Sequence, residues 1–239
     1  MKLRSMIGFC ALAVAAFGLE SNTCGLMNVP STAKTTMIAV PWVTVGGTAD
    51  AMKVANLVKT DTLSAGDELY YYDESTGTYY CWKLQDGAWK KTTTASQAGT
   101  FTAPTDDYAI ARGKGLFLVR QDTSKEIWLY GQAGTGSVSV KITAGAYNMI
   151  ANPNTTAYDI KDVAGGVGDQ VIAYDATGKQ ILYTKDGEGW YRMAPSETGV
   201  TIGGVTRYPS VKTYSGCTIP AGQGAWYVSK SEATPTIGW

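Results

Sequence analysis

Short apolar and aromatic runs, each closed by a turn, recur along the chain. Residues 68–73 (ELYYYD) and 170–175 (QVIAYD) are rich in strand-favouring side chains, and a Thr-Gly turn follows each of them. A second such run comes next, 78–84 or 179–184, and an Asp-Gly turn then leads to a tryptophan. This pattern predicts two consecutive β-hairpins at each place.

Helical periodicity is brief. It covers residues 49–58 and 157–163, and it predicts one short helix before each pair of hairpins. The runs 116–119, 225–228 and 137–142 read as further strands. The sequence therefore predicts an all-β protein made of antiparallel barrels or sandwiches, with little helix.

The chain also repeats itself. Four landmarks recur in the same order at offsets of 100 to 112 residues. They are 37–42 with 149–154, 66–77 with 168–178, 86–89 with 186–190, and 110–115 with 219–224. Such self-similarity predicts two homologous β-repeats, 35–130 and 145–239, joined by a linker and strand at 131–144. We expect a pseudo-two-fold axis between them, with a cleft at that axis as the natural place for a site.

The first residues have the pattern of a targeting segment. Lys2 and Arg4 precede an apolar run at 6–17 that ends in small residues, so a signal peptide over 1–18 is predicted. The run is too short for a bilayer core of about 30 Å, and no other stretch is long enough to span a membrane. We expect a secreted or extracytoplasmic protein with a flexible N-terminal arm at 19–34.

Several of these segments are similar to a known module. Residues 147–153 (YNMIANP), 168–170 (GDQ), 174–178 (YDATG) and 219–228 (IPAGQGAWYV) resemble a β-module of exported, mostly uncharacterised proteins from Verrucomicrobia, Planctomycetes and Bacteroidetes. The resemblance covers both halves and is clearer in the second. It implies an exported protein in a niche rich in polysaccharide or glycoprotein.

Composition narrows the chemistry. The 239 residues include no His, which excludes Ser-His-Asp triads, Cys-His dyads and His-ligated zinc. Lys+Arg and Asp+Glu both number 20, and this balance argues against a nucleic-acid surface. The acids lack the spacing of a calcium loop, so no metal or cofactor is predicted.

Aromatic side chains are the first candidates for a binding site. Alternation places Tyr70 and Tyr72 on one face of a strand and Tyr71 on the other, and it places Tyr80 and Trp82 on a shared face. An outward row of rings can stack on sugars, whereas cross-strand packing is the alternative. The predicted ligand-binding set is Tyr70, Tyr71, Tyr72, Tyr80, Trp82 and Trp89. It favours binding of a glycan, glycoprotein or cell-surface partner.

A second hypothesis rests on paired acids. Asp73 and Asp175 recur in equivalent turns, as do Asp67 and Asp169. Two carboxyls that share a proton can activate water without any His, as in aspartic peptidases. The alternative function is therefore an acid hydrolase acting on secreted glycoproteins such as mucin. However, the Asp-Thr/Ser-Gly triplet of those enzymes is absent, which favours Asx-type turns.

The cysteines leave two outcomes open. Cys10 is lost with the signal peptide, and Cys24, Cys81 and Cys217 remain as disulfide candidates. One pair would leave a third thiol free, or that thiol would join two molecules into a dimer.

Overall fold

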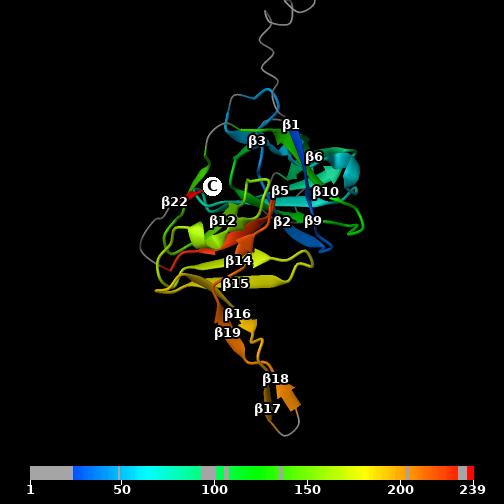
Figure 1. Ribbon diagram of the computed structural model, residues 1–239. Helices are drawn as coiled ribbons and strands as arrows, with labels where there is room; N and C mark the ends of the chain where they lie inside the picture. Colours follow the sequence, from blue (N-terminus) through cyan, green and yellow to red (C-terminus); the bar gives the residue numbers. More distant parts are fainter. Residues whose placement is uncertain are drawn as a thin grey trace, which may run out of the picture.

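A computed structural model of the chain describes residues 24–47, 49–92, 101–104, 108–134, 137–202, 205–230 and 236–239. Within these ranges the protein consists of antiparallel strands with one short α-helix (Figure 1). The all-β prediction is confirmed, and the open sheets fit a sandwich arrangement. The predicted signal peptide, 1–18, lies outside the described residues.

Two six-stranded antiparallel sheets form the body of the molecule. The first has the strand order β2 (Thr35–Ala39), β9 (Gly115–Val119), β4 (Glu68–Asp73), β5 (Thr78–Gln85), β6 (Ala88–Thr92), β7 (Phe101–Pro104). The second has the order β12 (Tyr147–Ala151), β21 (Gly224–Val228), β14 (Gln170–Tyr174), β15 (Gln180–Lys185), β16 (Trp190–Pro195), β19 (Ser210–Thr213). The predicted consecutive hairpins are present: β4 pairs with β5 and β5 with β6 in the first sheet, and β14 pairs with β15 and β15 with β16 in the second. The common origin of the two halves stays a prediction.

Two-stranded sheets and single helical turns make up the rest of the fold. The pairs are β1 (Cys24–Val29) with β10 (Ile127–Gln132), β3 (Ala51–Lys53) with β8 (Ala109–Ala111), β11 (Ser139–Lys141) with β22 (Thr236–Gly238), and β13 (Tyr158–Asp159) with β20 (Thr218–Ile219). The helical turns are α2 (Val54–Leu57) and the 3-10 turns η1 (Thr60–Thr62) and η2 (Ile160–Asp162). They lie inside or next to the two segments where a short helix was expected.

Each half has its own hydrophobic core. Alternate residues of β4 and β14 are buried, as the period of two in their sequences requires. The first core gathers around Leu69, Trp82 and Leu116, and the second around Val171 and Ile219.

The segment expected to be a flexible arm is part of the fold from Cys24 onward. β1 pairs with β10 along its whole length. The residues that follow β1 are held by Arg120, which is buried and donates to the carbonyls of Ser31 and Ala33 at 2.8 and 2.7 Å. The first structural unit therefore begins before residue 35.

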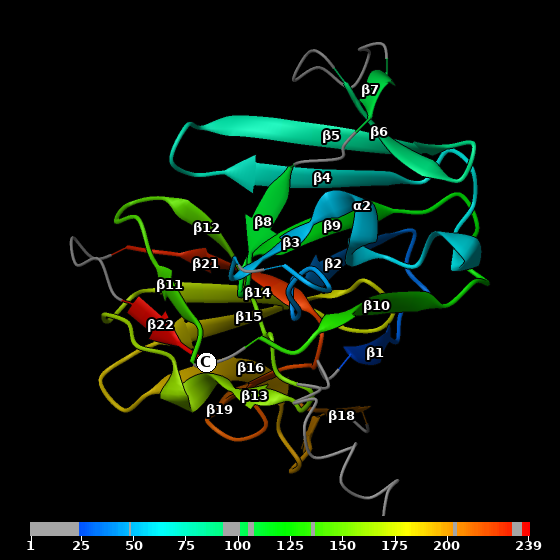
Figure 2. The same ribbon diagram turned by 90° about the horizontal axis from the view of Figure 1, so that it is seen from above.

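The two sheets meet at a seam where their backbones come close together (Figure 2). The Ala39 N–H donates to the Gly222 carbonyl at 2.7 Å, and the Ala151 N–H donates to the Gly113 carbonyl at 2.8 Å. A Cβ on Gly115 would lie 2.9 Å from the Ile150 carbonyl oxygen. This crossing therefore tolerates no side chain at residue 115.

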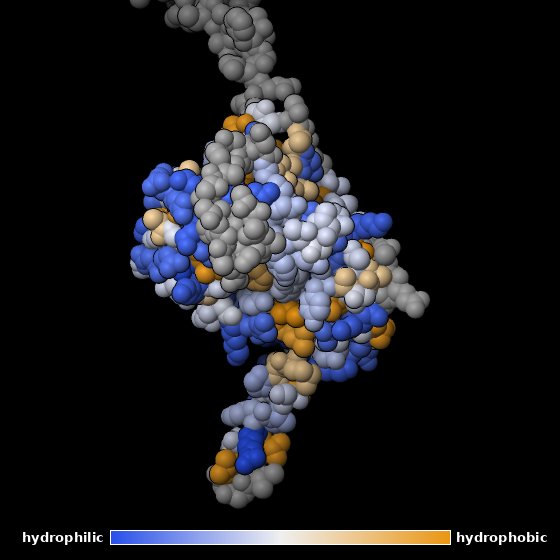
Figure 3. Space-filling view, turned by 180° about the vertical axis from the view of Figure 1, so that it is seen from behind, coloured by the Kyte–Doolittle hydropathy of each residue, from blue (hydrophilic) through white to orange (hydrophobic). Residues whose placement is uncertain are grey.

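A hairpin of β17 (Val200–Ile202) and β18 (Val205–Arg207) extends from β16 and β19 away from the body (Figure 1). Apolar side chains lie near its tip and at its base (Figure 3). The exposed apolar residues of the hairpin include Val200 and Val205.

We expect Gly115→Ala to destabilise the protein by about 1–3 kcal/mol, because the new methyl group forces the two backbones apart. Chemical denaturation of the purified protein measures the change. Gly187→Ala is the matched control, since a Cβ there meets nothing within 4 Å. Equal stability of the two variants would show that the seam is not tightly packed.

Candidate functional site

Three of the six predicted ligand-binding aromatics belong to the first core. Tyr71, Trp82 and Trp89 are buried, so they cannot present a surface to a ligand. Tyr80 is half-buried against the same core, and its ring stacks on Tyr71 with 6.5 Å between centroids. The prediction that these four residues bind a ligand is wrong, because they pack in or against the first core. The physical reason is that large rings on the face shared with the leucines gain most by leaving water.

The other two predicted aromatics lie on the opposite face of β4. The Tyr70 hydroxyl donates to Glu68 at 2.5 Å, and its strand partner on β9 is Phe117. The Tyr72 ring lies 4.7 Å from the ring of Tyr79, its partner on β5. Of the predicted set, Tyr72 contributes to a hollow of the described surface.

That hollow lies between the two halves and has a volume of about 460 Å³. The first half contributes residues from the turn region of β4 and β5, and the second half contributes the start of β12 and the middle of β21 (Figure 2). We call it the aromatic groove; its lining residues are Tyr72, Glu74, Tyr79, Thr143, Ala146, Tyr147 and Trp226.

The rings of Tyr79 and Tyr147 are open to solvent, and the ring of Trp226 packs against neighbouring rings. Tyr79 is 46% exposed and Tyr147 is 57% exposed. Trp226 packs edge to face against Tyr147, with centroids 6.1 Å apart, and it lies 5.8 Å from Phe117 of the first half. The groove therefore has rigid aromatic walls that come from both sheets.

Glu74 fixes the first half to the second beside the groove. Its side chain is only 9% exposed, its Oε2 lies 2.9 Å from the Lys114 Nζ, and its Oε1 accepts from the Met149 N–H at 3.0 Å. Glu74 is the single acid among the residues that line the groove.

The proposed acid pair does not form a shared-proton site. The Asp73 Oδ1 accepts from the Ser75 N–H and Oγ at 3.0 and 2.6 Å, and the Asp175 Oδ1 accepts from Thr177 in the same way. These side-chain hydrogen bonds lower the pKa of both carboxyls. Proton sharing requires that one of the two values be raised. The aspartates therefore act as Asx-type turn braces.

Asp67 and Asp169 are buried and brace the turns before β4 and β14. The Asp67 carboxylate accepts from the backbone N–H groups of Ser64 and Gln121 at 2.9 and 2.6 Å. The Asp169 carboxylate does the same with Gly166 and Lys230 at 2.8 and 2.7 Å. They satisfy buried backbone donors, which explains why both halves carry an aspartate there.

The three disulfide candidates are all unpaired. Cys81 is buried in the first half and Cys217 in the second, while Cys24 is exposed on β1. Because they are distributed over two cores and one surface, no bridge within the chain forms among them. Burial raises the pKa of Cys81 to about 11. Cys24 is therefore the one of the three thiols that is open to reaction.

Within the described ranges, no group of three or more Cys, Asp and Glu residues is arranged to hold a metal ion. In that same part of the chain, none of the helices has the length and apolar character needed to cross a bilayer. Comparison with protein-family models, with curated proteins and with solved structures gives no match. The fold and the groove thus define an antiparallel β protein with an aromatic surface hollow.

We expect the double variant Asp73→Asn, Asp175→Asn to be less stable than the native protein at neutral pH. Both carboxyls have a lowered pKa in the fold, so their contribution is present above the unfolded value of about 3.9 and is lost as the pH falls through the folded value. Denaturant midpoints at neutral and strongly acid pH test this. The deficit should disappear in acid, whereas exposed Asp162→Asn should show none at either pH.

Cys24 should react rapidly with a thiol reagent in the native protein, and Cys81 and Cys217 only after unfolding, since both are buried. The measurement is a thiol titration in a Cys10→Ser background, with and without denaturant. Cys24→Ser should remove the fast phase and any covalent dimer on a non-reducing gel. A fast phase that survives this change would contradict the assignment.

Proposed function

We propose that this protein is an exported binding protein that holds a glycan chain, free or carried by a glycoprotein or cell surface, in the aromatic groove. The observation that carries the proposal is the set of rings at the junction of the two halves: Tyr72, Tyr79, Tyr147 and Trp226. The predicted signal peptide and the resemblance to exported β-modules support the same setting.

The chemistry of the groove suits a sugar. A pyranose ring has apolar C–H faces that can lie on an aromatic face, and hydroxyls around its edge that bond to polar groups. Tyr79 and Tyr147 offer open rings with phenolic hydroxyls, and Thr143 adds a further hydroxyl to the wall. Binding of this kind requires no metal, no histidine and no charge excess.

The supporting scaffold keeps the cost of binding low. The rings stand on or beside strands β4, β5, β12 and β21, and Trp226 is fixed by its contacts with Phe117 and Tyr147. Side chains that are already ordered lose little conformational freedom when a ligand binds. A groove of this kind can hold a flexible polymer without a large rearrangement.

We expect Tyr147→Ala to weaken glycan binding about two- to tenfold, which corresponds to the loss of one ring contact. Tyr79→Ala combined with Tyr147→Ala should abolish it. The measurement is tryptophan fluorescence and affinity electrophoresis with a panel of soluble polysaccharides and mucin, because Trp226 lies in the groove.

The matched control is Tyr208→Ala. Tyr208 is 59% exposed, much like Tyr147 at 57%, but it lies by the β17–β18 hairpin. This variant should bind like the native protein. Native-like binding by the Tyr79, Tyr147 double variant, or no binding of the native protein to any member of the panel, would refute the proposed function.

A further inference from the structure

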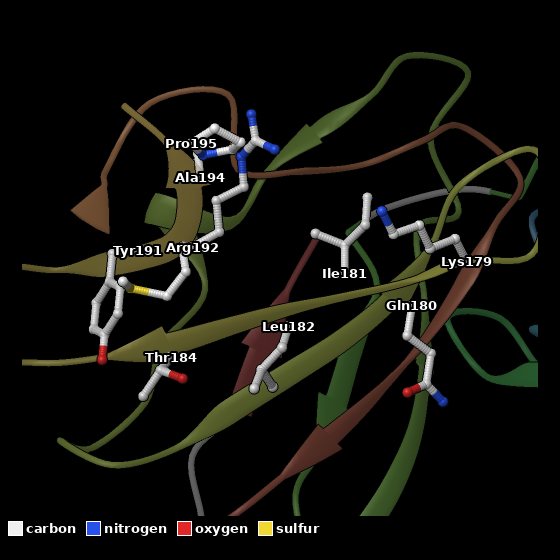
Figure 4. A pocket seen from close by; sticks show the side chains of 10 residues that line it. Lys179, Gln180, Ile181, Leu182, Thr184, Tyr191, Arg192, Ala194 and Pro195 are labelled. Carbon is white, nitrogen blue, oxygen red and sulfur yellow. The ribbon is translucent and has the colours of Figure 1, made fainter. Parts of the chain in front are cut away.

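A second hollow, of about 490 Å³, lies between strands β15 and β16 (Figure 4). The two strands pair only where Tyr183–Lys185 faces Trp190–Arg192. Beyond that point β15 pairs with β14 alone and β16 pairs with β19 alone. The sheet therefore splits, and side chains from both of its faces line the gap.

The hollow is cationic. Ten side chains line it, among them Lys179 and Arg192, and none of the ten is acidic. Arg192 is half-buried, its Nε is buried, and that atom forms no hydrogen bond within the described part of the chain. The positive charge of Lys179 helps to lower the pKa of the Asp175 carboxyl, so Lys179 already interacts with an acid of the chain. Arg192 is therefore the group whose charge is left for a ligand.

Cations close to Arg192 do have partners. The Lys212 Nζ lies 2.7 Å from the Asp186 carboxylate, and the Lys185 Nζ lies 5.3 Å from the centre of the Trp190 ring. Arg192 acts electrostatically on Tyr183 and Cys217, and burial keeps both of these neutral by raising their pKa. The guanidinium consequently faces neutral groups.

The first half has a cation at the position equivalent to Arg192, and two aromatic rings cover that cation. Lys91 faces Trp82 across β5 and β6, as Arg192 faces Tyr183 across β15 and β16. The Lys91 Nζ lies 4.4 Å from the centre of the Tyr80 ring and 4.8 Å from that of Tyr108. Each half therefore places a cation at this register position. In the first half the cation makes cation–π contacts with two rings.

Those two rings are replaced in the second half. Ile181 faces Ala173 as Tyr80 faces Tyr71, so Ile181 stands at the position of Tyr80. The Cys217 carbonyl accepts from the N–H of Ile160 at 2.7 Å, as the Tyr108 carbonyl accepts from the N–H of Val54 at 2.9 Å. Two smaller side chains thus stand where Tyr80 and Tyr108 stand. The exchange removes the rings that would stack on the cation, and the hollow lies at this place.

The rim of this hollow belongs to the same sheet face as the aromatic groove. Ile172 faces Trp226 on one side and Leu182 on the other. Trp226 lines the groove and Leu182 lines the hollow, so two strand spacings, or about 10 Å, separate them. One oligosaccharide can span the groove and the Leu182 rim. Arg192 pairs with Tyr183 and so lies on the other face of the sheet, where the gap between β15 and β16 gives access to it.

We propose that the hollow between β15 and β16 binds the anionic substituent of an acidic glycan, with Arg192 as its main contact and Lys179 as a second cation in its lining. This inference rests on the proposed function, because it names the class of glycan that the protein prefers. A guanidinium fits a carboxylate or sulfate through two parallel hydrogen bonds, and an ammonium group does so only as a point charge.

The test compares three soluble polymers: polygalacturonate, which carries carboxylates, dextran sulfate, which carries sulfates, and neutral dextran. We expect Arg192→Gln to weaken binding of an acidic polymer about tenfold or more and to leave binding of any neutral polymer unchanged. Arg192→Lys should recover only part of the affinity. Arg207→Gln, on the exposed hairpin, should have no effect.

The outcomes separate the two proposals. Equal binding of acidic and neutral polymers, with loss in the Tyr79, Tyr147 double variant, overturns the anionic site and leaves the groove. Binding of acidic polymers that depends on Arg192 but not on those tyrosines supports the anionic site and overturns the groove. Binding of no polymer overturns both. Thermal unfolding of each variant verifies that a loss does not come from misfolding, and the preferred acidic polymer distinguishes carboxylate from sulfate.

Discussion

The close crossing of the two sheets is the constraint on which the rest of the molecule depends. The N–H groups of Ala39 and Ala151, one from each sheet, donate to turn carbonyls of the other half. Gly115 leaves no space for a side chain at this crossing. A crossing this tight fixes the relative position of the two halves. The aromatic groove follows from it, because Tyr79 comes from one half and Tyr147 from the other.

Buried polar groups then hold the loops around this crossing. Asp67 and Asp169 accept from backbone donors in equivalent turns. Glu74 pairs with Lys114 of its own half and accepts from the Met149 N–H of β12 in the other half. In each case the carboxylate satisfies donors that burial would otherwise leave unpaired. Hydrogen bonding to backbone N–H groups explains why these acids recur in both halves, and paired-acid catalysis is not needed to account for them.

The two halves use the same strand order for different surfaces. In the first half Tyr80 and Tyr108 cover the cation at Lys91, so that region is closed by the chain itself. In the second half Ile181 and Cys217 leave Arg192 without rings and a hollow beside it. Two sheets with the same strand order thus contain one cation that is covered by rings and one cation that is not.

The sequence alone determined the two sets of hairpins, their turns and the all-β class. Alternation with a period of two is a local property, and so is the Asp and Gly chemistry of turns such as those at Asp73 and Asp175. It also determined that aromatic side chains crowd β4 and β5, but not which face they cover, because rings occur on both faces. The leucines that share a face with Tyr71 and Trp82 were the available signal for the buried side. Only the tertiary structure decided that Tyr147 and Trp226, more than sixty residues away from Tyr72 along the chain, complete the groove. The reason is physical: a site assembled across a seam depends on long-range packing, which no local pattern contains.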